Sequence, residues 1–126
     1  MAEPKDHYLA GLKLFGVQKH EEAIAEYDLA LAARPDWADV LLARATCLSS
    51  LGRHEEAVAG VKRVIELTPD DAMAYTSLSI FLQRKGLIPE AEQAAAKARM
   101  ISWKQELKTN PNAPPPEDPT GMKVVQ

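Results

Sequence analysis

Residues 20–36 read HEEAIAEYDLALAARPD, and residues 54–70 read HEEAVAGVKRVIELTPD. The second stretch starts 34 residues after the first. A weaker third copy follows at the same step, where Glu90 and Ala91 align with Glu56 and Ala57. A fixed period of this length is typical of an array of helix pairs, because each pair hides its apolar face against the next pair. The repeat therefore decides the fold class.

The same kinds of residue recur when each repeat is counted from Pro4, Ala38 and Ala72. Position 8 is always small, which suits a place where two helices touch, and position 20 is always alanine. The aligned sets are Gly11, Ala45 and Ser79 at position 8; Leu14, Leu48 and Leu82 at position 11; Ala23, Ala57 and Ala91 at position 20; Tyr27, Val61 and Ala95 at position 24; and Pro35, Pro69 and Trp103 at position 32.

This pattern resembles the tetratricopeptide repeat (TPR) family over roughly residues 4–105. The third copy departs from it, since Trp103 replaces the terminal proline and Ala95 stands at the large position 24. The resemblance implies an all-α, right-handed superhelical α-solenoid of three helix-turn-helix repeats, at about 4–37, 38–71 and 72–105. We expect a repeat domain over residues 1–108 with an extended last helix, and a proline-rich extended tail over 109–126.

Proline, glycine and aspartate predict where the six helices begin and end. Pro4 suits a first helical turn, and Pro35 and Pro69 are expected to stop the helices that precede them. Gly52 and Gly86 suit the left-handed residue that follows a helix. Asp36 and Asp70 are expected to cap the third and fifth helices.

Composition narrows the class of partner. The chain has 126 residues and a formal net charge of −3, which argues against a nucleic-acid-binding protein. A single cysteine, Cys47, gives no internal disulfide. The first residues carry no signal-peptide pattern, and no apolar run is long enough to span a membrane. We expect a cytoplasmic protein that binds no membrane.

In the TPR fold, positions 2, 5, 9 and 12 of each first helix line a concave groove. The resemblance therefore predicts a partner-binding groove that holds a protein or peptide through apolar anchors. The alternative is that Leu12, Phe15 and Ile80 only pack against one another or against the tail. The predicted groove residues are Lys5, Tyr8, Leu12, Phe15, Asp39, Leu42, Thr46, Ser49, Met73, Thr76, Ile80 and Gln83, with Arg84 at the rim.

Chaperone-tail recognition is not favoured. TPR domains that hold the carboxylate-ending tails of large heat-shock chaperones use a clamp of lysine, asparagine and arginine. The matching positions here are Tyr8, Leu12, Ala43, Met73 and Ser77. None of these side chains pairs with a carboxylate as lysine or arginine does.

The C-terminal end leaves two interpretations open. Ile101, Trp103 and Leu107 either fold over the third repeat or form an exposed flank that pairs with a second copy, which would make a homodimer. Residues 121–126, which turn apolar again, are either a frayed terminus or a short docking peptide.

Catalytic motifs are missing from the sequence. His20 and His54 share one repeat position, and neither has the second histidine that a zinc-peptidase helix requires. We therefore expect no enzyme, no cofactor and no metal site. The predicted function is a small adaptor or assembly chaperone that binds a peptide segment. The alternative is a self-associating scaffold that uses the last helix or groove–tail exchange.

Overall fold

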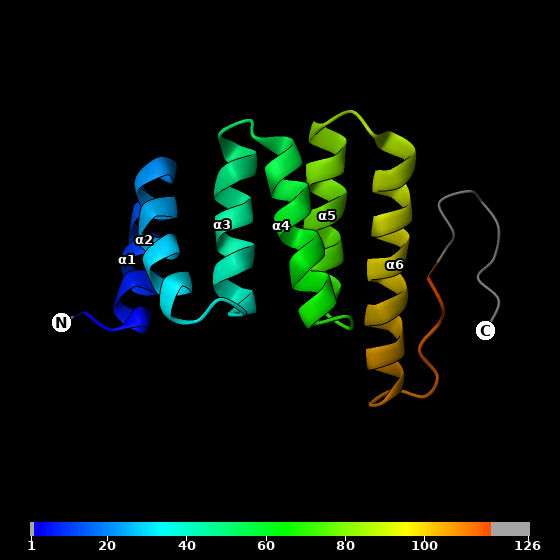
Figure 1. The fold of residues 1–126 in the computed structure, drawn as a ribbon. Coiled ribbons are helices and arrows are strands. Elements are labelled where there is room, and N and C mark those ends of the chain that lie inside the picture. Colours follow the sequence, from blue (N-terminus) through cyan, green and yellow to red (C-terminus); the bar gives the residue numbers. More distant parts are fainter. Residues whose placement is uncertain (1, 117–126) are drawn as a thin grey trace. The chain divides into compact units, whose positions relative to one another are not determined.

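The computed structural model describes residues 2–116, and every regular element in this part of the chain is a helix (Figure 1). The expected helix pairs are confirmed, with ends within one or two residues of those the sequence predicts. Their bounds are α1 (Pro4–Gly16), α2 (His20–Ala33), α3 (Ala38–Ser50), α4 (His54–Leu67), α5 (Ala72–Arg84) and α6 (Ile88–Leu107).

The packing divides the chain into two units, Met1–Pro69 and Asp70–Gln126. In the first unit, α1 packs on α2, α2 on α3, and α3 on α4, so this unit holds the first two repeats. In the second unit, α5 packs on α6, and this pair is the third repeat. The boundary between the units thus falls inside the predicted domain 1–108, at the junction of two repeats.

The small repeat positions lie where the sequence predicts close helix contacts. Ala23, Ala57 and Ala91, at position 20, are all fully buried. Gly11 is buried against Tyr27 of α2, and a Cβ added at Gly11 would lie only 2.6 Å from Tyr27 Cδ1. A real Cβ does not lie so close to a ring carbon. Tyrosine at position 24 therefore requires glycine at position 8 in the same repeat.

The turn inside each repeat has one conformation in all three copies. Gly52 and Gly86 have φ of +80° and +88°, as the sequence predicts for residues that follow a helix. At the equivalent place in the first repeat, Gln18 has a φ of +64°, which its residue type does not predict. In each turn the next residue's N–H donates to the carbonyl five residues back at 2.9 Å: Lys19 to Leu14, Arg53 to Leu48, and Leu87 to Leu82.

The predicted aspartate caps are wrong by one residue. The N-cap of α5 is Asp71, whose Oδ1 accepts from the Met73 N–H at 3.0 Å, and the N-cap of α3 is Trp37. Asp36 instead accepts a hydrogen bond from Arg63 of α4 at 2.8 Å. The chain needs one further residue after each proline-aspartate pair before it turns into the helix.

Candidate partner-binding surface

The predicted groove residues of the first unit differ in how much surface they offer. Lys5, Leu12 and Asp39 are exposed, and Ser49 is only 3% exposed, which leaves it no surface for a ligand. The remaining four are half-buried, namely Tyr8, Phe15, Leu42 and Thr46. Of these, Thr46 already donates its hydroxyl to the Leu42 carbonyl at 3.0 Å.

Tyr8 belongs to an aromatic cluster rather than to an open surface. Its ring centroid lies 5.1 Å from that of Trp37 in an edge-on arrangement and 6.2 Å from that of Tyr27. The Arg34 guanidinium lies 4.1 Å above the Trp37 ring. Burial, and secondarily the Asp39 carboxylate, raise the pKa of Tyr8. Truncating Tyr8 would remove two ring contacts and would therefore cost stability as well as groove surface.

Phe15 is also engaged inside its own repeat. Its ring meets that of His20 edge-on, with 5.4 Å between centroids, so α1 and α2 are joined at this end by an aromatic pair. Leu12, 39% exposed, is therefore the apolar side chain that α1 offers at a groove position. Leu9, on the same helix and 45% exposed, stands at a different repeat position.

The second unit presents its predicted groove residues more openly. Met73 is 66% exposed and Ile80 is 41% exposed, and Thr76, Gln83 and Arg84 are exposed as well. The Thr76 hydroxyl donates to the Ala72 carbonyl at 3.1 Å, so it faces the surface with an oxygen that can still accept a hydrogen bond.

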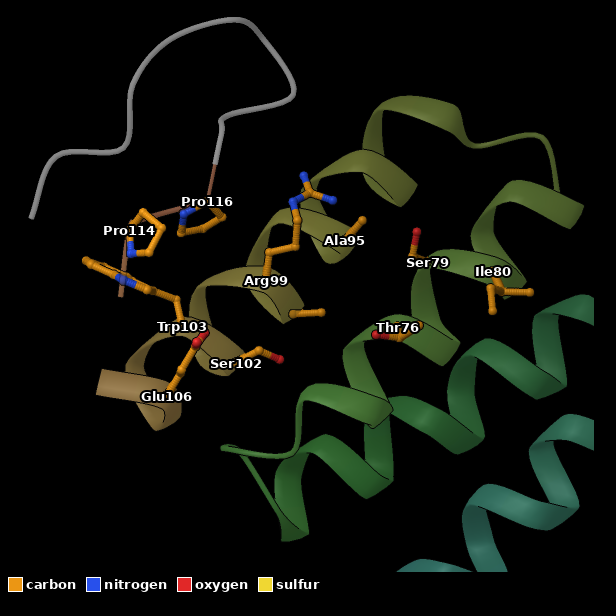
Figure 2. Close-up of a pocket in the computed structure, with 11 residues that line it drawn as sticks. Thr76, Ser79, Ile80, Ala95, Arg99, Ser102, Trp103, Glu106, Pro114 and Pro116 are labelled. Carbon is orange, nitrogen blue, oxygen red and sulfur yellow. The ribbon is translucent and has the colours of Figure 1, made fainter. Parts of the chain in front are cut away.

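A cavity of about 400 Å³ opens between α5, α6 and the segment that follows α6 (Figure 2). Thr76 and Ile80 belong to both the cavity and the predicted groove, whereas the repeat pattern predicts no pocket here. The sequence feature that could have indicated the cavity is Ala95, which stands where the other two repeats have the larger Tyr27 and Val61. The lining residues are Thr76, Ser79, Ile80, Ala95, Ala98, Arg99, Ser102, Trp103, Glu106, Pro114 and Pro116.

Trp103 is covered by the chain that follows α6. Its Nε1–H donates to the Ala113 carbonyl at 2.9 Å, and Figure 2 shows Pro114 and Pro116 beside its ring. Trp103 and Ile101 are each 7% exposed, and Leu107 is half-buried. Of the two interpretations left open, the described residues therefore favour closure within the chain over an exposed flank. Residues 121–126, for which a frayed terminus and a docking peptide were both left open, lie outside the described part.

Metal-binding groups, membrane-spanning helices and a reactive thiol are other features that could carry function in the described residues. Nowhere in residues 2–116 do three or more His, Cys, Asp or Glu side chains meet in a way that could bind a metal ion. No helix in that range is long and apolar enough to cross a membrane. Cys47 is fully buried, and burial raises the pKa of its thiol to about 11.

Repeated helix pairs with small residues at their contacts define a helical solenoid of the kind used for protein interaction. The tetratricopeptide repeat model matches residues 14–79, and the chain belongs to this family. Its all-α repeat fold also matches solved structures. The crystal structure of MamA has a TM-score of 0.78 and 25% identity, over 82% of this chain and 61% of that one.

One further solved structure and two sequence relatives are also similar to the chain. The Sgt2 TPR domain from Aspergillus fumigatus has a TM-score of 0.76 over 100% of this chain and 90% of that chain, with 20% identity, and so shows the fold alone. The Hsp70-Hsp90 organizing protein of Triticum aestivum is 33% identical over 81% of this chain, and the DnaJ homolog subfamily C member 3 of Rattus norvegicus is 28% identical over 88%. The chain spans only 16% and 20% of these two relatives.

Proposed function

We propose that the chain is a small adaptor or assembly chaperone that binds a peptide segment of a partner protein through apolar groove residues exposed on the first helices of its repeats. The observation that supports this proposal is that some positions of those helices are used in packing while others remain exposed. Positions 8 are buried in helix contacts, whereas Leu12, Met73 and Ile80, at groove positions, remain exposed. Exposed apolar side chains that packing does not use are typical of interaction surfaces.

The surface favours apolar anchors over a carboxylate clamp. Although one relative is named for organising Hsp70 and Hsp90, the clamp positions of this chain hold Tyr8, Leu12, Ala43, Met73 and Ser77, none of which is basic. Leu12 and Ile80 can instead bury against apolar side chains of a ligand. Each such burial contributes on the order of 1.5–3 kcal/mol when it is complete.

A peptide selection tests the proposal with a matched control on the same helix. The full chain is immobilised, peptides are selected from a random library, and the affinities of the best ones are measured by calorimetry for two variants. Leu12→Lys changes a groove position, and Leu9→Lys changes a leucine of similar exposure outside it. We expect the first to weaken binding by at least about tenfold, equivalent to 1.4 kcal/mol, and the second to leave it nearly unchanged.

Two results would contradict peptide binding through the groove. One is a library that yields no ligand for the folded chain. The other is an equal loss of affinity in both variants, which would show that a general change of surface charge, rather than the groove position, controls binding.

A further inference from the structure

The cavity of the second unit arises because the side chains at repeat positions 8 and 24 are both small in the third repeat. The pairs at positions 8 and 24 are Gly11 with Tyr27, Ala45 with Val61, and Ser79 with Ala95. In the first repeat the tyrosine ring fills the space that glycine leaves open, to the point that a Cβ on Gly11 would collide with it. In the third repeat both members are small, and the space beside them stays open.

The wall of this cavity suits an aromatic group. Trp103 contributes its ring, Ile80 and Ala98 contribute aliphatic surface, and Pro114 and Pro116 close one side (Figure 2). Aromatic rings pack favourably in tilted or offset arrangements at centroid distances of about 4.5–7 Å, which a ring beside Trp103 can adopt. A volume of about 400 Å³ also lies within the range of roughly 300–1,000 Å³ that is common for ligand pockets.

Arg99 gives the cavity a positive end. It occupies position 28, where the first two repeats have Leu31 and Ile65. Its side chain is exposed, and no ion pair joins it to another residue within 2–116. Glu106 lies two helical turns further along α6, which places it about 10 Å away along the helix axis. The pocket therefore favours an anion at the Arg99 end and repels one at the Glu106 end.

We propose that this pocket binds the aromatic side chain of an extended partner peptide, and that an acidic residue next to this aromatic residue pairs with Arg99. Ile80 and Thr76 belong both to the pocket and to the surface of α5, so the peptide backbone can leave the pocket along that helix. The guanidinium of Arg99 can bind a carboxylate through two parallel hydrogen bonds. The inference rests on the proposed function and specifies the sequence of the ligand.

The other repeats supply variants that should fill or neutralise the pocket without disturbing the fold. Ser79→Gly with Ala95→Tyr copies the first repeat, and Ala95→Val copies the ring-free second repeat. Arg99→Leu copies position 28 of the first repeat. Lys97→Leu removes a positive charge from an exposed residue of α6 that does not line the pocket, and it is the control for charge.

The test uses three capped synthetic peptides made of glycine and serine except for two central residues. These two residues are phenylalanine-glutamate in the first peptide, alanine-glutamate in the second and phenylalanine-glutamine in the third. Their binding to the full chain is followed by Trp103 fluorescence in a Trp37→Phe background and by calorimetry. We expect the first peptide to bind at least about tenfold more tightly than either of the others, since 1.4 kcal/mol is a factor of ten. Ser79→Gly with Ala95→Tyr should abolish the preference for phenylalanine, and Arg99→Leu the preference for glutamate, whereas Lys97→Leu should keep both.

Equal binding of the three peptides, or no binding of any, would overturn the inference. So would a preference that the filled pocket retains. If the library ligands depend on Leu12 but not on Ala95, the proposed function stands and the pocket fails. If sedimentation shows that the chain binds itself, and filling the pocket abolishes that association, the occupant is a second copy and the peptide inference is wrong.

Discussion

The turn at Gln18 predicts stability changes of opposite sign at two equivalent residues. Gln18 has a φ of +64° and Gly52 a φ of +80°, and both stand at position 15 of their repeats. A left-handed conformation costs an ordinary L-residue about 1–2 kcal/mol, and glycine avoids this cost but loses about 0.5–1 kcal/mol more chain entropy on folding. The substitution Gln18→Gly is therefore expected to raise the free energy of unfolding by about 0.5–1 kcal/mol.

The reverse change, Gly52→Gln, should lower the free energy of unfolding by a similar amount. A Cβ at Gly52 would meet no atom within 4 Å, so crowding does not contribute and only the backbone conformation matters. The Gln18 side chain is exposed, and both residues lie in the same unit. The pair of variants thus isolates the backbone cost.

Urea denaturation followed by the helical circular dichroism signal measures both changes. With a slope of about 1–3 kcal/mol per molar urea, the midpoint should move by roughly 0.2–1 M, upward for Gln18→Gly and downward for Gly52→Gln. The double variant should unfold near the wild-type midpoint. A lower midpoint for Gln18→Gly, or an unchanged one for Gly52→Gln, would refute the assignment of strain to this turn.

Three other predictions concern buried contacts. Gly11→Ala should destabilise the first unit by about 1–3 kcal/mol, because the new methyl group meets the Tyr27 ring, and adding Tyr27→Val should recover part of the loss in a double-mutant cycle measured by denaturation. Trp103→Phe should leave the buried Ala113 carbonyl without its hydrogen-bond donor, at a cost of about 1–3 kcal/mol of stability. Hydrogen exchange or proteolysis of the segment after α6 should then become faster. Unchanged protection of that segment would show that the Trp103 hydrogen bond does not hold it on α6. Cys47 should resist a thiol reagent at pH 8 in the native chain and react fully in denaturant. Because its folded pKa of about 11 lies above the unfolded value, its contribution to stability should be lost as pH rises from about 9 to 11, and Cys47→Ala should remove that part of the pH dependence.

The helices were predictable because their signals are local and repeated. Proline, glycine and the 34-residue period placed the helix ends, and the small residues of position 8 were expected at helix contacts, where Gly11, Ala45 and Ser79 are now buried. The aspartate caps were misplaced by one residue because a cap depends on backbone geometry around proline, which composition does not specify. Gln18 was missed although its repeat position pointed to it, since glutamine is not a residue expected at positive φ.

The surface was less predictable than the fold. Repeat position alone assigned Tyr8 to the groove, but its exposure depends on Trp37, which reaches it from the loop before α3. Likewise, the proline-rich composition predicted an extended tail, but not that Trp103 of α6 would donate a hydrogen bond to the Ala113 carbonyl or lie beside Pro114 and Pro116. Contacts between segments that are distant along the repeat pattern cannot be inferred from that pattern.

The shared filling of space by positions 8 and 24 also constrains how such an array can change through mutation. At a contact like that of Gly11 with Tyr27, neither residue can be exchanged alone without a clash or a void, so viable routes pass through paired replacements. The third repeat is not held by this constraint, because Ser79 and Ala95 are both small and leave room. A repeat with two small residues at these positions can acquire new specificity by single substitutions, while a repeat with a contact like that of Gly11 with Tyr27 preserves the scaffold.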